Sequence, residues 1–279
     1  MKHAVEHLGR SQRGACRAIG LNRSTLHYKP RGKNDEPLKQ AIRKIVERRR
    51  RFGQDRVYVV LRREGWPDNH KRVSRVYGEL GLSLRSRRRQ KRSAALRVPM
   101  PTALGPNQAW TMDFVHDRLA SGRVFKCLTV VDEFTRESLA IEVDFGMAGE
   151  RVTRVLDRLI ELRGKPVGIR TDNGPEFAGN VLDAWAYRQG VKLDFIQPGK
   201  PTQNAFIESF NGRFREECLN DNQFVTIVEA QVVIEVWRTD YNDERPHGSL
   251  NGLTPREFAE QHTTKLQLNI NLVPQLDLV

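Results

Sequence analysis

Between residues 108 and 241 the sequence predicts a fixed order of strands and helices. Three strands, at 109–116, 125–132 and 138–145, are apolar throughout or alternate with polar residues. An amphipathic helix at 152–164 comes next, and then a strand, a helix, a strand and two more helices. This order predicts an α/β domain with a mixed five-stranded sheet that is covered by helices on both faces.

Apolar residues at helical spacing predict which side of two of these helices packs against the sheet. In the helix at 152–164 and in the helix at about 203–218, the expected packing residues are Val155, Leu159 and Leu162, and Phe206, Phe210 and Phe214. Glu208, Asn211 and Arg215 are spaced at i, i+3 and i+7, and so share another stripe of the second helix. Glu208 and Arg215 are therefore expected to point the same way.

Three carboxylates lie in distinctive local sequences. Asp113 is in QAWTMDFV, Asp172 is in IRTDNGPEF and Glu208 is in PTQNAFIESFNGRFREECL, with 58 residues between the two aspartates and 35 between Asp172 and Glu208. Asp113 falls on the first strand, Asp172 at the end of the fourth and Glu208 on a helix. Carboxylate oxygens suit Mg²⁺, and paired metal ions can stabilise both the attacking and the leaving oxygen of a phosphodiester. The three residues predict a metal site for phosphoryl transfer.

The charge of the chain is divided unevenly along its length. The net charge is +13 and the isoelectric point is about 10.0. Residues 1–100 hold 28 Lys and Arg against 8 Asp and Glu, a net of +20, and the rest holds 19 against 26, a net of −7. A strongly basic segment indicates a polyanionic partner, so we expect the N-terminal part to bind DNA.

The basic part contains two patterns of the helix-turn-helix kind. Residues 11–28 predict two short helices around Gly20, and residues 35–83 predict three helices that end in a basic one. In that last helix Lys71, Arg72 and Arg75 are candidates for contacts with DNA phosphates or base edges. Residues 85–107 are rich in Arg, Lys and Pro and predict an extended basic linker.

Cysteine use and hydropathy narrow the class of protein. Cys16, Cys127 and Cys218 are isolated, so neither a disulfide framework nor a cysteine zinc site is indicated. No apolar run approaches 18 residues and no signal peptide opens the chain. We therefore expect a soluble, cytoplasmic protein without a membrane partner.

Taken together, these strings resemble the second reading frame of bacterial insertion-sequence transposases of the IS-three family, whose core is related to retroviral integrases. The resemblance is carried by NQAWTMDF, VVDEFTR, RTDNGPEF, ESFNGRFREECL and YNDERPHGSLNGLTPREF, and by the basic block that begins at FGQDRVYVVL. It suggests five segments, listed as helix-turn-helix-like, helix-turn-helix-like DNA-binding, basic linker, integrase catalytic core and a tail of unknown role: 1–34, 35–84, 85–107, 108–262 and 263–279.

The resemblance implies a ribonuclease-H-like core in which Asp113, Asp172 and Glu208 form a DDE triad. This triad would bind Mg²⁺, with Mn²⁺ as a substitute and two ions in the site, and would catalyse DNA strand cleavage and strand transfer. The implied partners are double-stranded DNA, as terminal repeats and target, and an upstream-frame product, acting as a homo-oligomer at the bacterial nucleoid. Further expected DNA contacts are Arg215, Lys200 and Asn204.

Two other functions remain open from the residues alone. A metal-dependent nuclease of the same fold would use similar carboxylates, and a DNA-binding regulator derived from a transposase would need none of them. Two further residues also keep alternative roles. Asp132 either supports the metal site or caps a turn, and His247 has a structural or DNA-contact role in preference to that of a general base.

Overall fold

The structure is a computed structural model, and it describes residues 9, 11–28, 34–84, 103–172, 174, 177, 179–196 and 205–262. Near the N-terminus lie two short helices, α2 (Gln12–Ala18) and α3 (Arg23–Leu26). The Asn22 side chain accepts a hydrogen bond from the backbone N–H of Ser24, which starts α3 where the sequence predicts a helix.

Three helices form a separate small unit with its own apolar core: α4 (Glu36–Arg48), α5 (Gln54–Arg63) and α6 (His70–Glu79). Leu38, Ile42, Val57 and Val76 are among the buried residues of this core. The α6 helix begins at Asn69, whose side chain accepts from the Arg72 backbone N–H at 3.0 Å. The break between α5 and α6 falls at residues 64–69, as the glycine and proline there predict.

The core domain is built on a mixed sheet of five strands, namely β1 (Ala109–Arg118), β2 (Val124–Asp132), β3 (Ser138–Asp144), β4 (Gly168–Thr171) and β5 (Lys192–Phe195). The strand order is β3-β2-β1-β4-β5. The first three strands pair antiparallel, whereas β4 pairs parallel with both β1 and β5. The prediction of a mixed five-stranded sheet is therefore confirmed.

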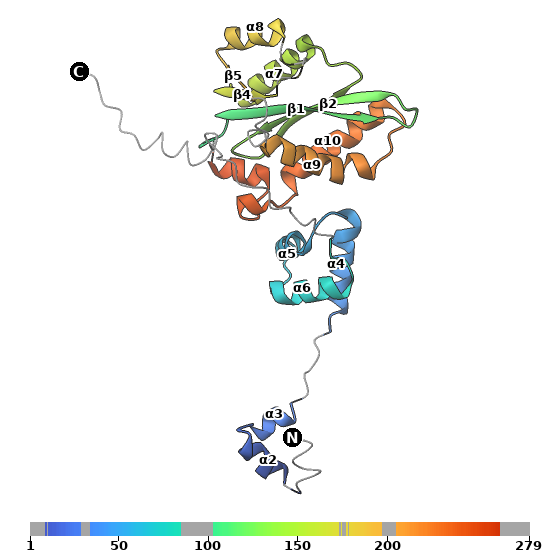
Figure 1. The fold of residues 1–279 in the computed structure, drawn as a ribbon, viewed down its shortest axis with the longest axis vertical. Helices are drawn as coiled ribbons and strands as arrows, with labels where there is room; N and C mark the ends of the chain where they lie inside the picture. Colours follow the sequence, from blue (N-terminus) through green and yellow to red (C-terminus); the bar gives the residue numbers. More distant parts are fainter. Residues whose placement is uncertain are drawn as a thin grey trace, which may run out of the picture.

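Helices cover both faces of this sheet (Figure 1). One face carries α7 (Gly149–Arg163) and α8 (Asn180–Gln189), and the other carries α9 (Ala205–Glu217) and α10 (Ile227–Asp243). Short 3₁₀ turns follow α9 and α10 at Leu219–Asp221 and Gly248–Leu250, and a further helix covers residues 255–262. Because strand residues alternate between faces, Trp110 and Met112 of β1 lie in the apolar core under α7 and α8, and Val115 lies in the core under α9 and α10.

Two residues of the predicted packing stripes lie elsewhere. Leu162 is 81% exposed at the end of α7, where Val152 and Leu156 pack inward instead. Phe206 is 36% exposed, and Ile207 takes its place beside Phe210 and Phe214 in the buried stripe of α9. The error in α9 comes from extending a period of four, which drifts around a helix of 3.6 residues per turn.

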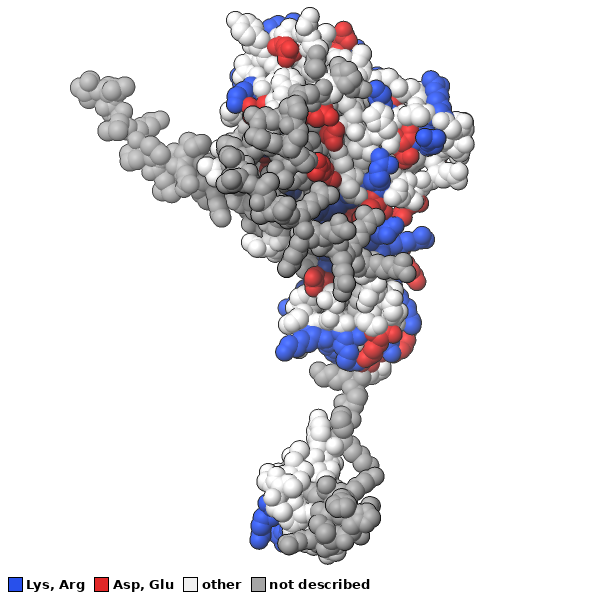
Figure 2. Space-filling view, viewed as in Figure 1, with Lys and Arg blue, Asp and Glu red and all other residues white. Residues whose placement is uncertain are grey.

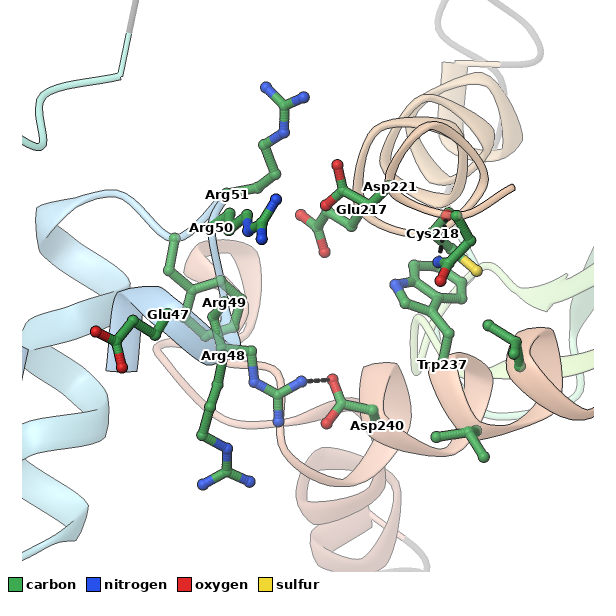
Figure 3. A pocket seen from close by; sticks show the side chains of 14 residues that line it. Glu47, Arg48, Arg49, Arg50, Arg51, Glu217, Cys218, Asp221, Trp237 and Asp240 are labelled. Carbon is green, nitrogen blue, oxygen red and sulfur yellow. Dashed lines mark hydrogen bonds and ion pairs between the residues drawn. The ribbon is translucent and has the colours of Figure 1, made fainter. Parts of the chain in front are cut away.

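The three-helix unit contacts the core domain through the loop that follows α4. A cavity of about 390 Å³ lies at this junction, with Arg49, Arg50 and Arg51 on one side and carboxylates of the core on the other (Figure 3). Arg49 Nη1 donates to Asp240 Oδ2 of α10. Nearby, Arg63 Nη2 donates to Glu257 Oε2 at 2.6 Å. Part of the basic charge of the N-terminal half is thus paired within the chain.

Candidate active site

Strand pairing brings Asp113 and Asp172 to the same place on the sheet. In the parallel pair of β1 and β4, Thr111 lies opposite Arg170. Two positions further along each strand are Asp113 and Asp172, and the second of these is the first residue after β4. Residues two apart in a strand share a face, so Asp113 lies on the side of Val115, which is the side covered by α9.

Helix α9 adds Glu208 to this edge of the sheet. A cavity of about 340 Å³ is bounded by β1 and α9, and its lining includes Asp113, His116, Glu208, Asn211 and Arg215. Asp172 does not line it, although its charge acts on Asp113 together with that of Glu208. The structure therefore brings the three predicted carboxylates into one neighbourhood, with Arg215 beside them.

The Asp113 carboxylate is held by a short network of hydrogen bonds. Its Oδ1 accepts from the backbone N–H of Phe114 at 2.7 Å, and its Oδ2 accepts from Asn211 Nδ2 at 2.8 Å. The Thr129 hydroxyl, on the strand opposite, lies 3.0 Å from Asn211 Oδ1 and 3.1 Å from the backbone oxygen of Asp113. Asn211 and Thr129 thus orient the carboxylate. The sequence signal for Asn211 was only its position three residues after Glu208.

The electrostatic state of the site follows from burial and from repulsion between carboxylates. Burial, and to a lesser extent the charges of Asp172 and Glu208, raise the pKa of Asp113 to about 6. The hydrogen bonds from Phe114 and Asn211 act in the opposite direction. A carboxylate in such surroundings gains from a nearby cation, which would favour its ionised form.

The donor set fits a hard divalent cation, since the three carboxylates offer oxygen ligands and the Asn211 amide supports one of them. Within the described ranges, no three His, Cys, Asp or Glu side chains stand close enough to hold a metal ion as they are placed. Binding a cation at this site would therefore require the side chains to adjust around it.

The raised pKa leads to a first prediction, on stability without metal. The carboxyl group of Asp113 has a pKa of about 6 in the folded state and an ordinary value of 3.8, so the folded chain binds more protons between these values. Stability contributed by this group is present below about pH 4 and is lost as the pH rises through about 6. We expect the Asp113→Asn variant to lack this loss, so its unfolding free energy should gain about 2–3 kcal/mol relative to wild type across the window.

The measurement is urea unfolding of both proteins in the presence of a chelator at several pH values from 4 to 7. The quantity compared is the change with pH in the difference between the unfolding free energies of the two proteins. A hydrogen bond that the amide loses shifts this difference equally at all pH values, so it does not affect the comparison. A difference between the two proteins that stays constant over the window would contradict the assignment of a buried, repelled carboxylate.

Of the six residues predicted to contact DNA, the structure describes four. Arg215 is exposed, and its Nη2 donates to the backbone oxygen of His116 at 3.0 Å. It forms no ion pair among the described residues, and Glu217 instead accepts two hydrogen bonds from Arg245. Lys200 and Asn204 lie outside the described residues.

On α6, Figure 2 shows Lys and Arg side chains with carboxylates beside them. Lys71 is exposed. Arg72 is largely covered and donates to Asp35 and Asp68, while Arg75 donates to Asp35 and Glu79. The hydrogen bonds of Arg72 fasten α6 to the start of α4, so of these three side chains Lys71 is the most available to a ligand.

The two residues with open roles are now placed. Asp132 is buried and accepts hydrogen bonds from the backbone N–H groups of Asn107, Phe134 and Thr135, so it caps the turn after β2. His247 is 6% exposed, behind α9 and away from the triad. Burial lowers its pKa to about 2, which keeps the imidazole neutral at physiological pH.

The fold and the grouped carboxylates define an integrase-core protein with an added helix-turn-helix unit. Residues 103–201 and 189–255 match two family models described as an integrase core domain, and residues 33–92 match one described as an HTH-like domain. The chain belongs to the insertion-sequence transposases of the IS-three family, which are DDE transposases that act in DNA transposition and recombination.

No helix among the described residues is long and apolar enough to cross a membrane.

Similar proteins span nearly the whole chain. The 31.7 kDa protein of insertion element IS407 from Burkholderia multivorans is 50% identical over 92% of this chain and 93% of its own length. The 39.2 kDa protein of insertion element IS476 from Xanthomonas euvesicatoria is 44% identical over 98% of this chain and 79% of its own. Among solved structures, a chain of the simian T-cell lymphotropic virus intasome has a TM-score of 0.53 at 15% identity, over 86% of this chain and 77% of its own, which shows likeness of fold alone.

Proposed function

We propose that this chain cuts DNA at the ends of an insertion sequence and joins the freed 3′ end to a new phosphodiester, with Asp113, Asp172 and Glu208 as the catalytic residues. The observation that carries the proposal is the convergence of the three carboxylates: two come from neighbouring parallel strands and the third from the helix packed on them. Such a cluster is costly for folding, because burial and mutual repulsion disfavour the charged form of Asp113. A cluster of this kind indicates a site kept for chemistry.

In this mechanism the three carboxylates hold divalent cations, Mg²⁺ or Mn²⁺, and we propose two ions. The bound ions would supply activation of water or of a 3′-hydroxyl and stabilisation of charge on the phosphate. Asn211 and Thr129 orient Asp113, which lines the cavity. Arg215, on the rim of the same cavity, binds a non-bridging phosphate oxygen of the strand.

The other proposed partners follow from the division of the chain. The segments 1–34 and 35–84 bind double-stranded DNA, the segment 85–107 links them to the core, and the core 108–262 acts on terminal repeats and target DNA. We propose that the chain works as a homo-oligomer on DNA and together with an upstream-frame product, by fusion or association. Its substrate places it at the nucleoid, in the cytoplasm of a bacterium.

The test is an end-cleavage and strand-transfer assay with labelled duplexes that carry the candidate element ends. Activity is expected with Mg²⁺ or Mn²⁺ and a substrate that has a free 3′-hydroxyl. Cutting without joining would favour the metal-dependent nuclease, and binding without either reaction would favour the regulator. Fusing the upstream frame to this chain should sharpen its preference for element ends over random DNA.

A second prediction concerns Arg215. Replacement by Ala should lower DNA affinity and reduce the slope of log affinity against log salt by about 1, since one phosphate contact is lost. Folding stability should change by less than about 1 kcal/mol, because the side chain is exposed and its one hydrogen bond is to a backbone oxygen. The matched control is Arg188→Ala on α8, an exposed arginine on the opposite face of the sheet. Equal salt slopes for the two variants would refute the contact.

A further inference from the structure

A third cavity, of about 280 Å³, lies on another face of the helix that carries Glu208. Its α9 wall includes Phe206, Ser209 and Arg213, none of which lines the cavity of the carboxylates. The rest of the wall includes Arg136, from the turn between β2 and β3, and His247, from the loop after α10. Segments more than 100 residues apart in the chain thus enclose one space beside the catalytic helix.

Two nitrogens that belong to the lining residues of this cavity have no partner among the described atoms. Arg136 Nη1 and His247 Nε2 are both fully buried and make no hydrogen bond. His247 as a whole is 6% exposed, and the Tyr241 ring packs edge-on against it at a centroid distance of 4.9 Å. Buried nitrogens without partners are uncommon in folded proteins, and a bound water, ion or other ligand is one of the few explanations.

Positive charge around this cavity exceeds negative charge. Besides burial, the charges of four arginines lower the pKa of His247. They come from different elements: Arg245 after α10, Arg213 of α9, Arg56 of α5, and Arg136. Arg245 is paired with Glu217, by hydrogen bonds of 2.8 and 2.6 Å.

The two arginines of the lining lack such a pair. In the part of the chain that the structure describes, neither Arg136 nor Arg213 forms a salt bridge. Glu133, the carboxylate whose charge acts most on Arg136, is paired with Arg170 through Oε1, and its buried Oε2 makes no hydrogen bond among the described residues. Arg213 Nη1 donates only to the backbone oxygen and the hydroxyl of Ser209, at 2.9 and 2.7 Å.

The guanidinium of Arg136 is also held in place. It stacks on the ring of Phe206, which lies outside the buried stripe of α9, with 3.8 Å from its central carbon to the ring centroid. The Arg136 backbone has a φ of 64°, in the left-handed region that costs about 1–2 kcal/mol for a residue other than glycine. The strained backbone and the stacked side chain together hold the partly desolvated guanidinium of Arg136 in a fixed position at the cavity.

We propose that this cavity binds one phosphate of the DNA backbone, with Arg136 and Arg213 donating to its non-bridging oxygens and His247 contacting it through Nε2. Arginine pairs with phosphate by parallel hydrogen bonds, and a neutral imidazole can add a further contact. The proposal rests on the proposed function for the source of the phosphate, which is the DNA strand being processed. Because Ser209 directly follows Glu208, a strand held here is positioned relative to the catalytic helix.

The test measures coupling between a side chain and a single DNA phosphate in the full chain, without metal. Duplexes are prepared in which one backbone phosphate at a time is replaced by a neutral methylphosphonate, and their affinities are measured for wild type and for Arg136→Gln. We expect one position where the replacement lowers the DNA affinity of wild type about tenfold. At that position the affinity of Arg136→Gln should fall by less than about twofold, because the variant already lacks the contact. The salt slope of Arg136→Gln should fall by about 0.9.

Arg213→Gln, at a half-exposed residue, repeats the measurement in case the first variant is unstable, and it should couple to the same phosphate. Arg188→Gln on α8 is the control with the same charge change and should couple to none. Coupling at no position, or equal coupling in the control, overturns the proposal. Binding of inorganic phosphate that Arg136→Gln abolishes, without coupling to DNA, also overturns it and assigns the cavity to a free anion.

The outcome is separate from that of the catalytic assignment. A wild-type chain that transfers strands but shows no coupling overturns the phosphate cavity alone. A chain that couples to one phosphate yet never joins DNA, even when fused to the upstream frame, upholds the cavity and overturns the catalytic proposal.

Discussion

Asp113→Asn, Asp172→Asn and Glu208→Gln should each lower strand transfer at least about 1000-fold while leaving DNA affinity within about threefold of wild type. The loss corresponds to about 4 kcal/mol of transition-state stabilisation, in the range that bound metal ions supply. The amides keep the shape of the side chains and remove one negative charge, so they weaken cation binding without removing any basic contact to DNA. The assay is strand transfer with Mn²⁺ as well as Mg²⁺.

Two matched variants separate the triad from carboxylates in general. Asp117→Asn changes an aspartate on the same strand, four residues after Asp113, and Glu216→Gln changes an exposed glutamate on the same helix as Glu208. Neither lines the cavity between β1 and α9, so both should retain activity within about twofold. Joining within tenfold of wild type by any of the three triad variants would remove that residue from the catalytic assignment.

Replacement of Arg170 by Met should lower the unfolding free energy by about 3–5 kcal/mol, which is the usual cost of removing one partner of a buried ion pair. Arg170 on β4 pairs with Glu133, in the turn after β2, and the two side chains are only 6% and 2% exposed. Burial raises the pKa of Glu133, and the charge of Arg170 opposes that shift. Without the guanidinium, the carboxyl group must hold a proton or remain charged in an apolar site.

Urea unfolding at neutral pH measures this loss, and two variants serve as controls. Arg43→Met breaks an exposed pair with Glu36, in which both side chains are more than half exposed, and should cost less than about 1 kcal/mol. The double variant Arg170→Met with Glu133→Met should recover most of the stability, since it leaves neither member of this ion pair without its partner. If the double variant is as unstable as Arg170→Met alone, the ion pair is not the cause.

Local pattern was sufficient for the elements and for the identity of the candidate catalytic residues. The alternation of Trp110, Met112 and Phe114 with polar neighbours predicts a strand, and the helices of residues 35–83 follow from apolar residues at helical spacing. Those signals depend on residues within one or two turns of each other, so they are readable without the fold. The resemblance to the transposase family likewise came from contiguous strings around Asp113 and Asp172, and family membership is confirmed by the close relatives.

Which residues meet across the chain was decided only by the tertiary structure. Glu133 and Arg170 are 37 residues apart in sequence, and neither flanking pattern indicates that they share a buried pair. Arg72 was predicted to contact DNA, yet its hydrogen bonds run to Asp35 and Asp68. The spacing of apolar residues indicates which positions face inward. It does not indicate which distant residue each of them contacts, because such contacts depend on strand order and helix packing.

The cavity of Arg136, Arg213 and His247 is the clearest example of contacts that only the tertiary structure decided. In sequence these residues lie far apart, and only His247 was singled out, with a structural or DNA-contact role. The fold places them around one space, with two buried nitrogens that lack partners. Sequence therefore determined the elements, the charge division and the candidate carboxylates, whereas tertiary packing decided which cations remain unpaired, because pairing is a property of distance in the folded chain.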